Sequence, residues 1–289
     1  MDKQNIMEGQ EAGIRLQDSR KSKVLKKAMD FDSYLFDLDG TIYVGEGVLP
    51  GAVSTIQALR ERSKTILFAT NTTVYTRETA RDKLMGMGIG CSLDEIMTAL
   101  TVAGKYFQDH APDAQVLLIG GPAMQEEMDR YGIACVTDPM KATHILVGLD
   151  KHFDYGKLTA GMTAMRNGAL LIAANSDPFC PTDKGVIPDT GSLVKALETA
   201  SMLPAFEILG KPSKYFADYA FEKLQCSPEQ CLMVGDRLDT DILLGNVHGM
   251  YTALVLSGSD SREGIVRTGI EPDYLWSSID ALIKDEPLT

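Results

Sequence analysis

Two aspartates that follow a short apolar segment place the strongest constraint on the fold of this chain. Tyr34-Leu35-Phe36 has the length and composition of a buried strand, and Asp37, Asp39 and Gly40 come directly after it. Side chains two positions apart in an extended segment point the same way, so both carboxylates can face a cleft beyond the strand. Carboxylates this close repel each other, and a divalent cation is the usual remedy, Mg²⁺ where all ligands are oxygens. A surface turn built on Asp-Gly is the alternative interpretation of this stretch taken alone.

A strand–helix–strand unit begins with this segment. The apolar residues within 53–59 recur at the three-residue spacing of one buried helix face, and residues 65–69 form a second continuous apolar strand. Such a unit is typical of a parallel sheet. Because the carboxyl ends of parallel strands share one edge, Thr70 and the residues after it should lie near Asp37.

The rest of the chain continues this alternation. The sequence predicts strands at residues 116–119, 145–147, 169–173, 231–234 and 252–256, and helices at residues 77–85, 93–107, 155–166, 192–200 and 214–224. The strands in the middle of the chain read as an α/β unit of their own. Three prolines make residues 175–191 an expected irregular loop, and loops of that length often carry function.

Composition excludes several classes of protein. The 289 residues are 44% hydrophobic and 24% charged, as expected of a globular chain with a sizeable core. A net charge of −12 argues against broad nucleic-acid or anionic-membrane binding, and no apolar run reaches the ~18 residues that span a bilayer. The five cysteines are scattered and lack zinc-site spacing. With no apolar segment near the amino terminus, we expect a cytoplasmic protein.

Four short motifs stand in a definite order along the chain: Asp37-Leu38-Asp39-Gly40-Thr41, Thr70-Asn71, Gly210-Lys211-Pro212 and Gly235-Asp236-Arg237-Leu238-Asp239-Thr240-Asp241. Together they resemble the motifs of the haloacid dehalogenase superfamily in its phosphatase branch. Their surroundings look like the NagD-like, 4-nitrophenylphosphatase-like subfamily, which includes AraL-like sugar phosphatases. The resemblance covers about residues 31–282, and it implies an α/β core with a Rossmann-like, doubly wound parallel sheet.

The spacing of the motifs indicates an inserted domain. Only 31 positions separate Asp39 from Thr70, whereas 141 separate Thr70 from Lys211. The longer interval leaves room for a cap of about 100 residues, the size of a small domain. In the family that this chain resembles, the type-two cap is inserted between the second and third motifs. We predict an amino-terminal polar lead at residues 1–30, a catalytic core at residues 31–108 and 206–289, and an α/β cap at residues 109–205.

The resemblance assigns roles to the core residues. Asp37 is the expected nucleophile, which forms an aspartyl-phosphate, and Asp39 is the expected general acid and base. A Ser or Thr in place of Asp39 could not shuttle the proton, so the second Asp favours a phosphatase. The Thr70 hydroxyl, the Asn71 N–H and the Lys211 ammonium are expected to bind the phosphoryl oxygens.

The resemblance also implies a metal site. Mg²⁺ is the expected cofactor, held by Asp37, the backbone carbonyl of Asp39 and Asp236. Asp241 is expected to brace these ligands from outside the coordination sphere.

The cap is expected to select the substrate. Its candidates for contacting the leaving group are Asn175, Asp177, Phe179 and Cys180. Relatives often read Ala-Thr-Asn-Pro-Asp where this chain has Ala173-Ala174-Asn175-Ser176-Asp177, and Thr-Asn-Asn where Thr72 follows Asn71. The substrate therefore stays open among sugar phosphates, pyridoxal phosphate, phosphoglycolate, glycerol phosphate and nucleoside monophosphates.

The combined prediction is a Mg²⁺-dependent phosphatase of small phosphorylated metabolites. It has no expected nucleic-acid or membrane partner, and a homodimer through the cap is expected from the resemblance. Three alternatives stay open. A phosphotransferase or mutase would pass the same phosphoryl group to an organic acceptor, a phosphoprotein phosphatase would act on a protein substrate, and a metabolite-binding module would not catalyse any reaction.

Overall fold

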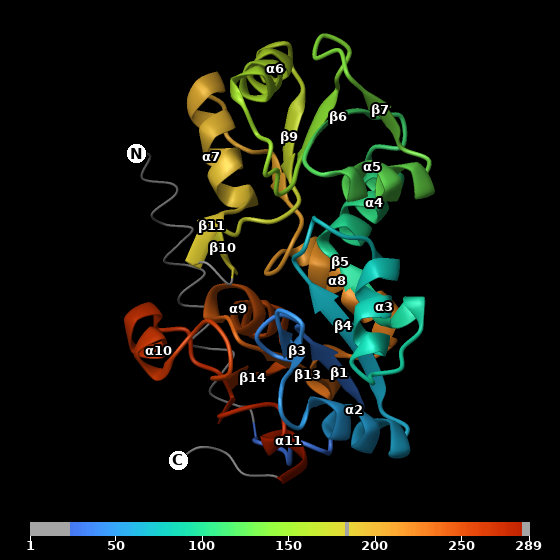
Figure 1. Ribbon diagram of the computed structural model, residues 1–289, viewed down its shortest axis with the longest axis vertical. Coiled ribbons are helices and arrows are strands. Elements are labelled where there is room, and N and C mark those ends of the chain that lie inside the picture. The colour runs from blue at the N-terminus through green and yellow to red at the C-terminus, as the bar shows by residue number, and fades with distance from the viewer. Residues whose placement is uncertain (1–23, 183–184, 285–289) are drawn as a thin grey trace.

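Two parallel sheets organise the structure, a computed structural model that describes residues 24–182 and 185–284. The larger sheet forms the lower half of the molecule in Figure 1, and a second sheet lies above it. In spatial order the larger sheet consists of β15 (Tyr274–Trp276), β14 (Tyr251–Val255), β13 (Cys231–Gly235), β1 (Ser33–Phe36), β4 (Thr65–Thr70) and β5 (Ile96–Thr98). Every neighbouring pair in it is parallel.

Helices cover both faces of the larger sheet, because alternate side chains of its strands point to opposite sides. Leu35 and Met233 belong to one apolar cluster, whereas Tyr34 and Val234 belong to another. The first face is covered by α4 (Ala99–His110), α8 (Lys214–Leu224) and α9 (Leu243–His248), and the second by α2 (Ala52–Glu61), α3 (Arg77–Gly86) and α11 (Ala281–Lys284). Helix α10 (Arg262–Thr268) packs near the end of β14. The predicted doubly wound α/β core is confirmed.

The second sheet is built from the middle of the chain. Its strands are, in spatial order, β12 (Glu207–Ile208), β9 (Leu170–Ala173), β8 (His144–Val147), β6 (Gln115–Ile119) and β7 (Ala134–Val136). One face packs against α6 (Tyr155–Arg166) and α7 (Thr190–Ser201). The other face, with α5 (Pro122–Arg130), joins the apolar cluster of α4, so one continuous core links the two sheets. The predicted domain boundaries stay predictions, and the second sheet extends through Ile208, past the predicted boundary at residue 205.

Two local predictions are wrong. The helix predicted at residues 93–107 is divided into a 3₁₀ turn (Leu93–Glu95), strand β5 and helix α4. Strand β5 pairs with β4 at the edge of the sheet, and the Thr98 side chain accepts a hydrogen bond from the Thr101 N–H to start α4. Sheet pairing here overrides a helical pattern, because propensity is a weak guide against tertiary contacts.

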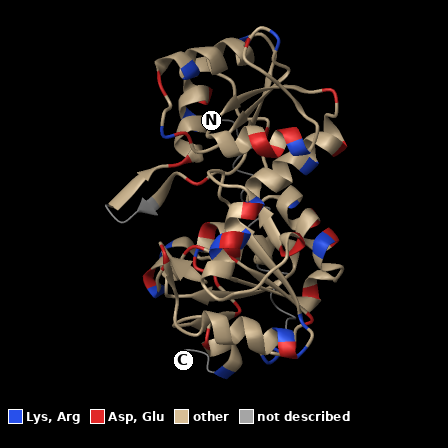
Figure 2. Ribbon diagram, turned by 45° about the vertical axis from the view of Figure 1, so that its right-hand side comes forward, with Lys and Arg blue, Asp and Glu red and all other residues tan. Residues whose placement is uncertain are grey.

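The second wrong prediction concerns residues 175–191, which are not wholly irregular. They contain a hairpin of β10 (Phe179–Thr182) and β11 (Gly185–Pro188), which projects from the side of the molecule in Figure 2. Within the described residues, each strand pairs only with the other, so prolines that lack an N–H are tolerated there. A second small hairpin, β2 (Tyr43–Val44) and β3 (Gly47–Val48), follows the first aspartates.

The segment that precedes β1 is hydrogen-bonded to the core from residue 24 onward. The Tyr251 hydroxyl donates to the Val24 carbonyl, and the Tyr34 hydroxyl donates to the Ala28 carbonyl. The rest of the predicted polar lead, residues 1–23, lies outside the described residues. Among the helices that the structure describes, none has the length and apolar character needed to cross a bilayer.

Candidate active site

The order of the strands brings the four motifs together. Strand β1 lies between β4 and β13, and all three run in the same direction. Asp37 follows β1, Thr70 ends β4 and Asp236 follows β13, so these residues share the carboxyl edge of the larger sheet. Lys211 reaches the same place from the second sheet, where the Leu209 N–H donates to the Ala173 carbonyl at 2.9 Å.

A buried lysine lies at the centre of the site. Lys211 is only 2% exposed, and its ammonium nitrogen is 2.6 Å from Asp37 Oδ1 and 2.7 Å from Asp241 Oδ1. Its third donor reaches the Ala69 carbonyl at 3.2 Å. An ammonium group has three N–H donors, so all of them are used and the position of the charge is fixed.

Three carboxylates around this lysine can hold a metal. Asp37, Asp236 and Asp241 each offer an oxygen, and these oxygens lie within 4.8 Å of one another. A set of oxygen donors with this charge fits Mg²⁺. The Ser259 N–H donates to Asp236 Oδ2 at 2.6 Å and orients that carboxylate. A side chain at Gly258 would place its Cβ 2.0 Å from the same oxygen, so the chain keeps this position free for Asp236.

Burial and mutual repulsion disfavour the charged forms of Asp37 and Asp236. Burial raises the pKa of Asp37 well above its usual range. The nearby Lys211 ammonium lowers this pKa by less than burial raises it, and the charges of Asp241 and Asp236 raise it further. Burial, followed by the charge of Asp241, raises the pKa of Asp236 to about 7. One lysine does not offset three buried carboxylates. A divalent cation among them would favour their charged forms and lower the pKa of Asp37 and Asp236.

Asp39 lies apart from this cluster, at the open side of the site. The residue is exposed as a whole, but its carboxylate is partly buried, and Asp39 Oδ2 accepts a hydrogen bond from the Tyr43 hydroxyl at 3.4 Å. The Tyr43 hydroxyl is also 3.1 Å from that of Tyr75, and the Lys83 ammonium lies 3.9 Å from the centre of the Tyr43 ring. Desolvation by the surrounding protein raises the pKa of Asp39, and Lys83 is the main group that opposes this rise. A raised pKa suits a group that must both give and take a proton.

The phosphate-binding candidates Thr70 and Asn71 are both buried at the end of β4. Thr70 Oγ1 accepts a hydrogen bond from the Thr72 N–H at 3.1 Å. Two of the predicted cap residues reach Asn71. Asn175 Nδ2 donates to the Asn71 carbonyl at 2.8 Å, and Asn71 Nδ2 donates to Asp177 Oδ2 at 3.1 Å.

The other two predicted cap residues are not brought to this edge. Phe179 is 49% exposed on the projecting hairpin, and Cys180 lies next to it on the same strand, β10. Sequence reasoning gave no role to Arg237, although it stands inside the fourth motif. Its guanidinium lies 3.8 Å from Asp177 and pairs at 3.1 Å with Asp239.

Sequence reasoning also missed Tyr43, Tyr75 and Lys83. These residues belong to three separate segments, and only the fold places them beside Asp39. Tyr43 stands two positions after the first motif, and this closeness is the one signal that could have found it.

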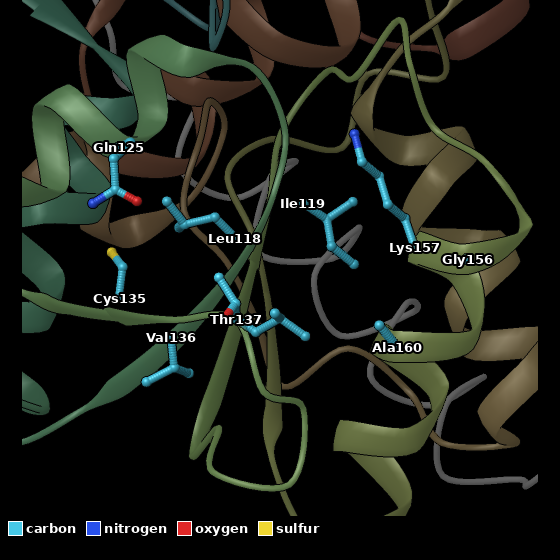
Figure 3. Close-up of a pocket in the computed structure, with 10 residues that line it drawn as sticks. Leu118, Ile119, Gln125, Cys135, Val136, Thr137, Gly156, Lys157 and Ala160 are labelled. Carbon is cyan, nitrogen blue, oxygen red and sulfur yellow. The ribbon is translucent and has the colours of Figure 1, made fainter.

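A pocket of about 360 Å³ lies elsewhere, in the second sheet (Figure 3). Leu118 and Ile119 of β6 line it, with Gln125 and Cys135 on one side and Lys157 on the other. None of its lining residues belongs to the four motifs or to the candidate cap residues. The pocket is therefore separate from the site at the carboxyl edge of the larger sheet.

Comparison with known proteins defines the class. A family model described as haloacid dehalogenase-like hydrolase matches residues 34–134, and a second, HAD-hydrolase-like model matches residues 208–282. The chain therefore belongs to the haloacid dehalogenase-like hydrolases, in their phosphatase branch. The resemblance inferred from the sequence is confirmed.

Individual relatives narrow the class. The chain is 35% identical to human glycerol-3-phosphate phosphatase, over 90% of this chain and 88% of that protein. It is 31% identical to the sugar phosphatase AraL of Bacillus subtilis, over 86% of this chain and 91% of the relative. Among solved structures, p-nitrophenyl phosphatase from Archaeoglobus fulgidus matches 89% of this chain and all of its own, with a TM-score of 0.85 and 29% identity.

Proposed function

We propose that this protein is a Mg²⁺-dependent phosphatase of small phosphorylated metabolites that forms an aspartyl-phosphate on Asp37. The observation that carries this proposal is the arrangement at the sheet edge. Lys211 contacts Asp37, two further buried carboxylates lie beside them, and Asp39 stands nearby on the open side. This arrangement supplies a nucleophile, a positive charge, a metal site and a proton donor in one place.

In the first step, an Asp37 carboxylate oxygen attacks the phosphorus atom of the ester. The bond between phosphorus and the leaving oxygen breaks, and Asp39 gives its proton to that oxygen. Lys211 holds Asp37 Oδ1 at 2.6 Å, which leaves Oδ2 as the attacking atom. Lys211 and the main-chain N–H of Asn71 offset the charge on the phosphoryl oxygens.

In the second step, Asp39 takes a proton from a water molecule, whose oxygen attacks the phosphorus atom. The bond to Asp37 breaks, inorganic phosphate leaves, and both carboxylates return to their initial states. Asp37, Asp236 and the backbone carbonyl of Asp39 are the groups we propose to hold Mg²⁺, which would offset the charge of the transferring group when bound. Asp241 contacts Lys211 and accepts from the Arg237 N–H, consistent with a bracing role.

We further propose that the substrate is a sugar phosphate or glycerol phosphate. Two relatives of this chain are named for these substrate classes. The contacts of Asn175 and Asp177 with Asn71 place the second sheet over the carboxyl edge, which favours a small substrate. A cytoplasmic location and a homodimer through the cap stay expectations of the same proposal.

Phosphate release from a panel of esters tests the reaction. The panel contains glycerol phosphate, sugar phosphates, 4-nitrophenyl phosphate and a phosphopeptide, each with Mg²⁺ and with EDTA. The proposal predicts Mg²⁺-dependent release from the small esters and none from Asp37→Asn. Asp109→Asn, which changes a surface carboxylate paired with Lys105, is the matched control and should keep full activity.

Other outcomes would favour the alternatives. Release from the phosphopeptide alone would indicate a phosphoprotein phosphatase. A phosphorylated product that forms only when an acceptor alcohol is added would indicate a phosphotransferase. Binding of an ester without turnover, by a folded protein with Mg²⁺ present, would indicate a metabolite-binding module and would contradict the proposal.

A further inference from the structure

The polar groups of Asn71 are almost fully engaged by protein. Its carbonyl accepts from Asn175 Nδ2 at 2.8 Å, and its Nδ2 donates to Asp177 Oδ2 at 3.1 Å and to the Lys211 carbonyl at 3.3 Å. Its Oδ1 accepts from the Lys211 N–H at 2.8 Å. Among the described residues, these contacts leave the main-chain N–H as the group that Asn71 can offer to a ligand.

Asn175 and Asp177 are themselves fixed in place. Asn175 is 1% exposed, and its Oδ1 accepts from the Asp177 N–H at 3.0 Å. The remaining oxygen of Asp177, Oδ1, faces the Arg237 guanidinium at 3.8 Å. Both side chains are thus committed to protein partners, and each reaches the phosphate-binding strand from the second sheet.

The close packing at Gly210 supports a fixed geometry. A Cβ at this position would lie 2.8 Å from each of three atoms, the Ala174 carbonyl oxygen, Asn175 Cβ and Asn71 Oδ1. Contacts at that distance are repulsive for a side chain. The backbone next to Lys211 therefore passes directly between Asn71 and Asn175, and the three segments are held at a set separation.

We propose that Asn175 and Asp177 are positioning residues for the reaction. They hold Asn71 so that its N–H points at the phosphoryl group, beside the positive charge of Lys211. This inference rests on the proposed function and gives these two side chains a role different from contact with the leaving group. Small misplacements of a group that binds the reacting centre have large effects on rate, which makes the role measurable.

The two roles predict different patterns across substrates. A residue that positions Asn71 acts on the phosphoryl group, which every ester shares. Its loss should therefore reduce kcat/KM by a similar factor for 4-nitrophenyl phosphate, glycerol phosphate and a sugar phosphate. A residue that contacts the leaving group should affect the hydroxylated esters and leave 4-nitrophenyl phosphate nearly unchanged.

The experiment compares Asn175→Ala, Asp177→Ala and Asp177→Asn on these three esters. We expect the two alanine variants to lose about 10- to 100-fold in kcat/KM on every ester. Asp177→Asn should recover most of this loss, because an amide oxygen can still accept from Asn71 Nδ2. Glu126→Ala, an exposed change on α5, is the control and should match the wild type.

Several outcomes would overturn the positioning role. These are alanine variants as active as the wild type, losses confined to the hydroxylated esters, or Asp177→Asn as slow as Asp177→Ala. Thermal unfolding identifies a variant that does not fold, in which case the other alanine variant decides. A wild type without turnover on any ester would instead overturn the proposed function and this inference with it.

Discussion

At Lys211, one ammonium group contacts the carboxylates of Asp37 and Asp241 and the carbonyl of Ala69, which come from three separate segments. A buried charge with partners of opposite sign is costly to remove from one side only, because the partners then lie unpaired in a medium of low polarity. The lysine therefore has a structural role in addition to its proposed role toward the phosphoryl group.

Lys211→Met should lower the free energy of unfolding by about 3–5 kcal/mol in EDTA. Burial already raises the pKa of Asp236 to about 7, and loss of the lysine would raise the folded-state pKa of Asp37 and Asp236 further. When the pKa of a carboxylate is higher in the folded state than in the unfolded state, the folded state loses stability as the pH rises through the folded-state pKa. The destabilisation should therefore be larger above the pKa of Asp236 than below it.

Urea unfolding at several pH values measures this effect. The matched control is Lys195→Met, which removes a lysine that is 77% exposed and paired with Glu198, and which should cost less than about 1 kcal/mol. Equal losses for the two variants would contradict the buried-charge argument.

At the scale of single elements, the turn from β12 to Lys211 is closely packed against two other segments of the site. Gly210→Ala would place a methyl group 2.8 Å from atoms of Ala174, Asn175 and Asn71. Overpacking of this kind costs about 1–3 kcal/mol, and it should also reduce activity because Lys211 follows directly. Gly86→Ala, near the end of α3 with open space around it, should be neutral or slightly stabilising.

Thermal unfolding and ester hydrolysis of the two glycine variants check this prediction. If Gly210→Ala unfolds at the wild-type temperature and keeps its activity, the segments are not held as closely as the structure indicates.

Elements also show what a sequence can and cannot predict. The strands that end at Phe36, Thr70 and Gly235 were predictable because each is a short apolar run followed by a polar motif. Strand β5 was not, since Ile96-Met97-Thr98 becomes a strand only by pairing with β4. Contacts between distant segments also limit what the sequence predicts at the active site. Asp37 and Asp236 are visible in motifs, whereas the Tyr43–Tyr75 pair and the contact of Asp177 with Arg237 arise from segments far apart in the chain.

At the scale of the whole molecule, two sets of contacts join the sheets. On one side, Met124 and Met128 of α5 extend the apolar cluster of the larger sheet, and Arg130 pairs with Glu78 of α3. On the other side, Asn175 and Asp177 bind Asn71. Asp37, Asp39 and Asp236, the residues that we propose to hold the metal, come together only when the chain folds. Folding and metal binding should therefore be linked.

Mg²⁺ should therefore raise the unfolding temperature of the wild type relative to EDTA. A ligand that binds only the folded state stabilises it by about 2.7 kcal/mol at 100 times its dissociation constant. Asp236→Asn should remove most of this shift. Asp239→Asn changes a side chain in the same motif that is 54% exposed and pairs with Arg237, and it should keep the shift.

A shift that survives in Asp236→Asn and vanishes in Asp239→Asn would place the metal elsewhere. Calorimetric titration of both variants with Mg²⁺ gives an independent measure of the same difference, without reference to catalytic activity.

If the phosphoryl group passes through Asp37, the phosphorylated intermediate can be trapped on that residue. In Asp39→Asn, the group that activates water for the second step is absent. The first step can still proceed with 4-nitrophenyl phosphate, because its leaving group needs little help from an acid. The measurement is acid quenching of this variant with the ester and Mg²⁺, followed by peptide mass spectrometry. We expect one phosphoryl group on the peptide that contains Asp37, and none when EDTA replaces Mg²⁺. A wild type that turns over the ester, together with a variant that carries the phosphoryl group on another residue or on none, would contradict it.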